Sequence, residues 1–338
     1  MLEPVPGRAS GVGSWPGTDV LDTLRITLGE LPEPHVPYVP ELPARGPGAD
    51  LVGRAAALLV DLPVDLQPAG WRLVDRPGRD LARARAWLRQ DLDALAEVAE
   101  GYAGPLKIQC CGPWTLAAGL HLPRLERAVV DAGASRDLVG SLAEGLARHV
   151  AEVRRLVPGA EVVVQLDEPS LPAVLSGALP TASGFGRLRA VEESVAVDGL
   201  RTVLDAVRVS GAVATLVHCC ADDPPVEVLS RTGAQGLSLD VSRLGRAGWE
   251  AVATVVEARV ALWAGAVPTT GTVPSVSTAV DAVWSRWRTL GLDAALLAGV
   301  VLTPACGLAR SSPQDARARL ARTRQAAAAL AERAAEEA

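Results

Sequence analysis

Short apolar or β-branched runs alternate with longer segments of helical periodicity along almost the whole chain. Runs of this kind are typical of strands, and the intervening periodicity is typical of helices. The candidate strands are residues 11–15, 35–40, 106–111, 162–166, 213–219, 236–239, 260–267 and 300–303. Eight strands that alternate with helices predict an α/β fold, a closed (β/α)8 TIM barrel rather than an open sheet.

The helical segments support the same architecture. The clearest are residues 80–100, 135–156, 191–210, 275–290 and 312–337, and several begin at Ser or Asp. Residues 42–104 are too long for one crossover, so we expect an excursion between the second and third strands. Because neither a linker nor an internal repeat interrupts the pattern, we expect residues 1–338 to form a single domain.

Composition excludes several classes of function. The net charge of -6 and the presence of one lysine, Lys107, argue against a nucleic-acid surface. No apolar run is long enough to span a bilayer, and residues 1–6 do not resemble a signal peptide. Five cysteines without disulfide-type spacing indicate reduced thiols. The sequence therefore predicts a cytoplasmic protein without a membrane partner.

Metal-type ligands lie where three of the predicted strands end. His218 and Cys220 end the fifth strand and point to the same face, whereas Cys219 points to the other. Asp240 ends the sixth strand and Cys306 follows the eighth. Zinc accepts imidazole, thiolate and carboxylate ligands, so these four residues predict a zinc site at the barrel mouth. The alternative is that they are merely small buried groups.

Five segments in order resemble a known family. Residues 12–16 resemble Ile-Gly-Ser-Phe-Pro, 165–169 resemble Gln-Ile-Asp-Glu-Pro, and 218–220 resemble His-x-Cys. Residues 239–243 resemble Ile-Glu-Thr-Ser-Arg, and 304–308 resemble Pro-Asp-Cys-Gly-Leu. Together they resemble the C-terminal catalytic barrel of cobalamin-independent methionine synthase, within the group that also holds uroporphyrinogen decarboxylase and thiol alkyltransferases.

The resemblance implies a role for each matched residue. It implies zinc as cofactor, homocysteine as substrate, and a zinc-dependent methyltransferase that makes methionine. His218, Cys220 and Cys306 would be ligands, and Asp240 would stand where the family has Glu. The homocysteine-binding residues would be Gly13 and Ser14 for the carboxylate, and Asp167 and Glu41 for the ammonium.

Simpler roles are open for some of these residues. Asp167 and Glu168 are equally typical of a loop-capping acid pair, and Ser14 of a turn hydroxyl. The physical logic of the zinc role is thiol activation, because a free thiol of pKa about 8.5 is mostly protonated at neutral pH. The carboxylate is the least soft of the four ligands, so we expect Asp240 to yield its place to the substrate sulfur.

The family residues that handle the folate donor are not evident. Gly119 stands where the family has a stacking Trp, unless Trp114 substitutes, and Ala173 stands where it has an acid. The strand-seven His is absent from residues 266–271, so no catalytic residue is assigned. These departures predict a different methyl donor, and a methylated corrinoid or its carrier protein is the first to test.

Two other functions remain open. One is a thiol alkyltransferase of the epoxyalkane:coenzyme M type, which shares the ligand pattern. The other is a barrel that binds zinc or methionine without catalysis, because loss of a proton-transfer group can remove much of the rate. Cys110 and Cys111 lie in the third strand near the same mouth, where one of them should face inward, and they are expected to be structural.

Overall fold

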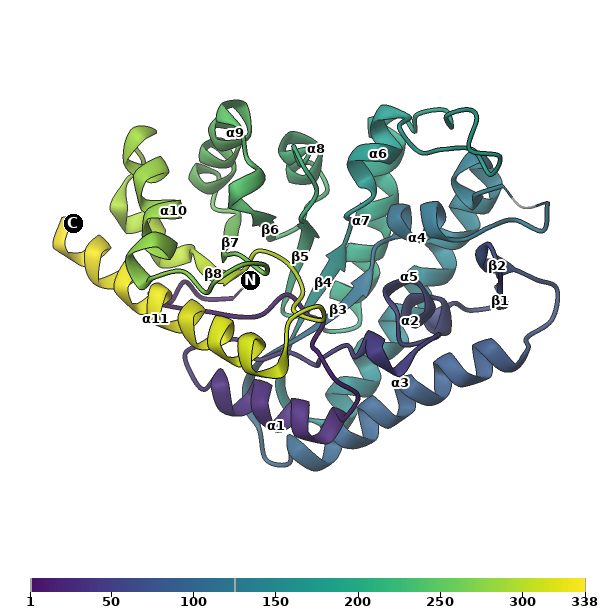
Figure 1. Ribbon diagram of the computed structural model, residues 1–338, viewed down its shortest axis with the longest axis horizontal. Helices are drawn as coiled ribbons and strands as arrows, with labels where there is room; N and C mark the ends of the chain where they lie inside the picture. The colour runs from purple at the N-terminus through teal and green to yellow at the C-terminus, as the bar shows by residue number, and fades with distance from the viewer. Residues whose placement is uncertain (1, 125, 338) are drawn as a thin grey trace.

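A parallel sheet of six strands forms the middle of the molecule, and helices surround it (Figure 1). The computed structural model describes residues 2–124 and 126–337. The strands are hydrogen-bonded in chain order: β3 (Ala103–Cys111), β4 (Gly159–Asp167), β5 (Ala214–Cys219), β6 (Gly236–Asp240), β7 (Ala261–Val267) and β8 (Val301–Pro304). These six strands confirm the third to eighth predicted strands.

The two N-terminal segments expected to be strands do not form them. Instead they connect the edges of the sheet through single parallel bridges, with Ala9 beside Leu302 of β8 and Tyr38 beside Lys107 of β3. Pro37 and Pro40 provide no backbone N–H, so a continuous ladder cannot form along the second segment. The expected eight-stranded barrel is therefore not confirmed, and the described chain has a curled six-stranded sheet.

Apolar side chains divide into a concave and a convex cluster. Val36, Val163, Ala214, Leu216, Trp263 and Val301 form the small cluster. The large cluster joins the helices to the other face of the strands, and it includes Val217 and Cys219. Because side chains alternate along a strand, His218 lies on the same face as Leu216. The concave face is thus apolar near the strand starts and carries His218 near their carboxyl ends.

The predicted excursion is present between the N-terminal segments and β3. It holds η1 (Pro43–Arg45), α2 (Leu51–Leu58) and the antiparallel hairpin of β1 (Val64–Gln67) and β2 (Gly70–Leu73), followed by α3 (Arg79–Val98). No local pattern predicts the hairpin, because its strands are only four residues long.

The long helices confirm the predicted helical segments. They are α3, α5 (Ala132–Leu156), α7 (Glu193–Val209), α10 (Val276–Thr289) and α11 (Pro313–Glu337). The other described helices are α1 (Val20–Glu30), α4 (Pro113–Gly119), η2 (Ala128–Val130), α6 (Leu171–Ser176), α8 (Val226–Ser230), η3 (Val241–Arg243), α9 (Arg246–Glu257) and η4 (Ala294–Gly299). The Ser275 side chain accepts a hydrogen bond from the Thr278 amide and so caps α10. Among the described helices, none has the length and apolarity needed to cross a membrane.

Candidate metal centre and substrate cavity

A cavity of about 190 Å³ lies at the carboxyl ends of β4 and β5. It brings together residues that are far apart in sequence, including every residue predicted to bind the amino-acid substrate. The lining includes Gly13, Ser14, Glu41, Asp167, His218, Cys220 and Cys306. Three predicted metal ligands and four predicted substrate residues therefore face one space.

The three ligand residues form a compact group. Ligand atoms of His218, Cys220 and Cys306 all lie within 4.8 Å of one another. The two sulfurs are 2.9 Å apart and belong to free cysteines. Such a group suits zinc, because structural and catalytic zinc sites use Cys sulfur and His nitrogen ligands in close array.

The imidazole of His218 is oriented for metal binding. Its Nδ1 lies 3.1 Å from the Ser238 carbonyl oxygen, which only accepts hydrogen bonds, so Nδ1 carries the proton. The Ser238 hydroxyl is 2.9 Å from the same nitrogen. Nε2 is buried and has no hydrogen-bond partner among the residues that the structure describes. An unpartnered lone pair beside two sulfurs is the arrangement expected of a ligand that is oriented by its other nitrogen.

One of the two cysteines holds a thiolate readily. The Cys220 thiol donates a hydrogen bond toward Cys306 and so lowers the pKa of Cys306, an effect that burial opposes and the neighbouring His218 reinforces. The same contact raises the pKa of Cys220. Cys306 is therefore the more acidic ligand, and thiolate is the form in which cysteine binds metals.

Asp240 does not join this group. Its Oδ1 accepts hydrogen bonds from the Ser242 amide at 3.0 Å and the Ser242 hydroxyl at 2.6 Å, which caps η3. Its Oδ2 lies 3.6 Å from Nε of Arg243, which also pairs with Asp222. The carboxylate is thus bound within its own turn, while the ligand group has only His218, Cys220 and Cys306. The fourth ligand position is thus not filled by Asp240 in this conformation.

Two buried acids stand where the substrate ammonium is expected. Burial raises the pKa of Asp167 to about 6 and that of Glu41 to about 7. The Gln165 amide donates to Asp167 at 2.7 Å. Lys107, which is 0% exposed, lies near both acids and donates to the Val12 carbonyl oxygen at 2.6 Å. The acids are therefore held in a low-dielectric environment where their charges act strongly.

The segment that carries Ser14 packs closely against the loop after β8. A Cβ atom at Gly307 would lie 2.0 Å from the Ser14 hydroxyl oxygen, and one at Gly13 would lie 2.7 Å from the Gln109 side chain. The Leu308 amide donates to the Ser14 carbonyl at 2.8 Å. A larger residue at either position would require the Ser14 or Gln109 side chain to move, and the close packing brings Ser14 to the side of the cavity next to Cys306.

Glu168 has the contacts of a capping acid, which was the simpler of the two roles considered for it. It is fully buried, and its oxygens accept hydrogen bonds from the amides of Trp114 and Thr115 and from the Thr115 hydroxyl. The carboxylate thus caps the first turn of α4. Asp167, one residue earlier, points into the cavity instead, so the two adjacent acids have different roles.

The remaining cysteines lie outside the ligand group. Cys219 is fully buried among apolar side chains on the convex face, as strand alternation predicted. Cys110 and Cys111 are buried in β3, where Cys111 is the register partner of Asp167. Burial raises the pKa of both thiols, so they are expected to remain protonated.

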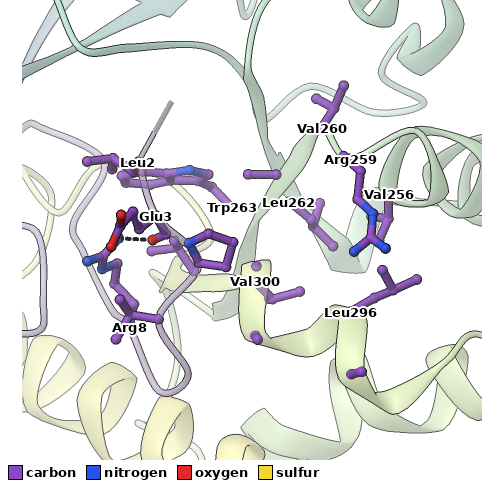
Figure 2. A pocket seen from close by; sticks show the side chains of 17 residues that line it. Leu2, Glu3, Arg8, Val256, Arg259, Val260, Leu262, Trp263, Leu296 and Val300 are labelled. Carbon is purple, nitrogen blue, oxygen red and sulfur yellow. Dashed lines mark hydrogen bonds between the residues drawn. The ribbon is translucent and has the colours of Figure 1, made fainter.

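A separate cavity of about 140 Å³ lies at the amino ends of β7 and β8 (Figure 2). Its lining is mostly apolar and includes Leu2, Leu262 and Trp263, and Arg8 donates to the Glu3 carbonyl oxygen across its rim at 2.9 Å. None of the predicted site residues lines it. This end of a parallel α/β fold usually serves stability, so we assign it no part in the site.

Residues 8–329 match the family model described as the catalytic domain of cobalamin-independent synthase. The chain belongs to this family. The match spans nearly the whole chain and includes the cavity residues, so the methionine-synthase resemblance inferred from five short segments is confirmed. This cobalamin-independent synthase domain is therefore a methionine-synthase-like enzyme.

The fold of this synthase domain is similar to that of the B12-independent methionine synthase from Shewanella sp. W3-18-1, solved in complex with selenomethionine. The TM-score is 0.59 at 13% identity, covering 98% of this chain and 99% of the other. The GH20 β-N-acetylhexosaminidase of Streptomyces coelicolor A3(2) has a TM-score of 0.34 at 13% identity, covering 71% of this chain and 60% of the other. The family 1 β-glucosidase of Thermotoga maritima has a TM-score of 0.31 at 8% identity, covering 90% of this chain and 91% of the other. The likeness to the Shewanella enzyme concerns the fold alone, and the two weaker ones carry no argument about this chain. A search of curated proteins found no match.

At the two positions considered for stacking on a donor, the synthase domain presents no aromatic ring to the ligand cavity. A Cβ atom at Gly119 would lie 2.7 Å from Val52, so helix packing fills the space of a larger side chain. Trp114 is buried against α7, where its Nε1 donates to the Ala196 carbonyl at 2.8 Å. Trp114 therefore does not line the ligand cavity and does not substitute for the family Trp.

Sequence reasoning missed three residues near the site. Lys107 lies in the third predicted strand, and its place there is the only sequence signal that its side chain could face inward. Ser238 is two residues before Asp240 and therefore on the same face. Arg54 lies in α2 within the excursion and touches Glu41, and no local pattern marks it.

Proposed function

We propose that this protein is a zinc-dependent methyltransferase that moves a methyl group onto the thiol of homocysteine and forms methionine. The observation that carries the proposal is the shared cavity, where a cysteine and histidine group faces two buried acids. A substrate with a thiol at one end and an ammonium at the other fits this arrangement of charges.

The chain's own residues would hold the substrate in a fixed orientation. Asp167 and Glu41 would accept hydrogen bonds from the ammonium, and the Ser14 hydroxyl and amide would hold the carboxylate. His218, Cys220 and Cys306 would hold the metal. Zinc, when bound, would lower the pKa of a coordinated thiol so that its sulfur is a nucleophile at neutral pH. The new S–C bond would form as the methyl group leaves its donor, and the thiol proton would be released.

We propose a non-folate donor, with a methylated corrinoid or its carrier protein as the first choice. Support comes from Gly119 and Trp114, because neither offers a ring to the cavity for stacking on a folate. An exposed cavity mouth would suit a donor delivered from outside the chain. Free cysteines in the ligand group suit the reducing cytoplasm.

The donor and the acceptor can be tested together. Zinc-loaded protein is mixed with homocysteine and either methylcobalamin or methyltetrahydrofolate, and methionine is measured by mass spectrometry. We expect methionine with methylcobalamin only, and none from the Cys306→Ala variant. Methionine from the folate donor would contradict the choice of donor, and no product with any donor would favour the non-catalytic binding role.

The main alternative is a coenzyme M-type alkyltransferase, which has a sulfonate thiol as substrate. A sulfonate needs cationic partners, yet no arginine or lysine is among the described residues that line the cavity. Two acids in that lining would repel it. The charges of the cavity therefore favour an amino-acid thiol.

A further inference from the structure

A buried chain of charged side chains runs from the substrate cavity into the excursion. Glu41 Oε1 lies 3.3 Å from Nε of Arg54 in α2, and Arg54 pairs through Nη1 with Asp91 of α3. The other oxygen of Asp91 lies 2.7 Å from Nη2 of Arg45. The Arg45 guanidinium in turn stacks over the Trp87 ring, 4.9 Å from its centroid. Negative and positive side chains therefore alternate from Glu41 to Arg45.

Burial makes this chain of charges sensitive to the loss of any member. Arg54 is 8% exposed and Asp91 1%, so neither charge is hydrated. Removal of one partner from a buried pair is costly because the other charge remains in a low-dielectric environment. The guanidinium of Arg54 has the fork geometry needed to contact two carboxylates at once, which lysine lacks.

Arg54 touches Glu41 from outside the cavity. Glu41 lines the cavity, whereas Arg54 and Asp91 do not. We propose that Arg54, itself held by Asp91, is a positioning residue that presents the Glu41 carboxylate to the ammonium of the amino-acid substrate. This assignment rests on the proposed function, because it names the part of the site that selects an α-amino thiol over a simple thiol.

The physical basis is the charge of Glu41. Burial raises its pKa to about 7, and the Arg54 guanidinium opposes that rise. Without Arg54 the acid would be more often neutral, and a neutral acid attracts an ammonium only weakly. It would also lose the contact that fixes its rotamer, since Glu41 Oε1 has no hydrogen-bond partner among the described residues. Asp91 would affect Glu41 only indirectly, by holding the guanidinium of Arg54 in place.

The test compares two thiols that differ only in the amino group. Dissociation constants of zinc-loaded protein are measured by calorimetry for homocysteine and for γ-mercaptobutyrate, which lacks the amine. The variants are Arg54→Met and Arg54→Lys. The matched control is Arg85→Met, because Arg85 also joins α3 to α2, through the Ala57 and Leu59 carbonyls, without reaching Glu41.

We expect Arg54→Met to weaken homocysteine binding about 10- to 100-fold and to change γ-mercaptobutyrate binding less than about two-fold. Arg54→Lys should recover part of the loss, and Arg85→Met should bind both thiols as wild type does. In the Glu41→Gln background, Arg54→Met should add no further selectivity, because its effect acts through Glu41. Thermal melts identify any variant that fails to fold, and Asp91→Asn then serves as the second probe, with a smaller amine-specific loss.

Equal weakening of both thiols, with zinc content and melting temperature retained, would overturn the assignment, because a structural role would not distinguish the amine. Additive losses in the double variant would also overturn it. A wild type that binds neither thiol would refute the proposed function and this assignment with it. A wild type that binds both thiols equally well would refute only the amine-selecting role.

Discussion

Nδ1 of His218 lies 3.1 Å from the carbonyl oxygen of Ser238 on the neighbouring strand, and this contact leaves Nε2 as the free nitrogen of the ring. A backbone carbonyl cannot rotate away, so the tautomer and the ring plane are fixed before any metal arrives. Preorganisation of this kind reduces the conformational cost of binding. The register of β4 with β5 places Asp167 beside His218 on the other side of the strand, so two neighbouring ladders align the metal-binding and substrate-binding halves of the site.

Metal content should depend on the three grouped ligands and not on the adjacent cysteine. We expect His218→Ala, Cys220→Ala and Cys306→Ala each to remove near-stoichiometric zinc, because two remaining ligands bind it weakly. Cys219→Ala is the matched control, since its side chain faces the convex cluster. Inductively coupled plasma mass spectrometry of purified proteins provides the measurement. Zinc lost equally from the Cys219 variant would contradict the ligand assignment.

Asp240 should matter less for the metal than either cysteine ligand. Asp240→Asn keeps an oxygen that can accept from Ser242, so we expect η3 and zinc content to be retained. Asp240→Ala should lower the free energy of unfolding by about 1 kcal/mol through loss of the cap. Zinc titrations and denaturant melts of the two variants test this. Zinc loss from Asp240→Asn as severe as from Cys306→Ala would mean that the carboxylate turns from Ser242 to the metal.

Glu168 should contribute to stability and not to binding. Glu168→Ala would leave two amides and the Thr115 O–H at the start of α4 without an acceptor, so the free energy of unfolding should fall by roughly 3 kcal/mol. The control is Glu193→Ala, because its ion pair with Arg231 is exposed and should be worth less than about 1 kcal/mol. Urea unfolding monitored by tryptophan fluorescence gives both values. Equal effects of the two substitutions would contradict the capping role.

The pKa of Glu41 predicts a stability that depends on pH. It is raised to about 7 in the folded protein, so between about pH 4.5 and 7 the folded state holds a proton that the unfolded state has lost. The contribution of this group to stability is therefore lost as pH rises through that window. Without metal, the melting temperature of wild type should fall relative to that of Glu41→Gln as the pH rises from about 5 to about 8. Parallel pH profiles would contradict the raised pKa.

The sequence was most informative where chemistry and periodicity coincide. Six strands and the long helices were predictable, because apolar runs and caps such as Ser275 are local signals. The grouping of His218, Cys220 and Cys306 followed from strand alternation and from the rule that sites lie at carboxyl ends. The two N-terminal segments are wrong as strand predictions, because both make only isolated bridges, and in residues 35–40 the apolar pattern conceals two prolines that interrupt the ladder.

The remaining features depend on contacts that only the folded chain reveals. Asp240 hydrogen-bonds Ser242 within its own turn, and a pattern of residue types does not distinguish this role from metal binding. The adjacent acids Asp167 and Glu168 look alike in sequence, although one caps a helix and the other lines the cavity. The pairing of Arg54 with Glu41 joins two segments whose register no periodicity predicts.

Lys107 gives the protein a built-in reporter of its own opening. It is the only lysine of the chain and is 0% exposed. An amine-directed reagent therefore has no lysine to modify while the curled sheet stays closed around that side chain. The rate at which the Lys107 peptide becomes labelled measures how often β3 and the N-terminal segments separate, a local event that need not accompany global unfolding. Labelling rates with and without zinc and homocysteine would show how far the ligands reduce this local opening.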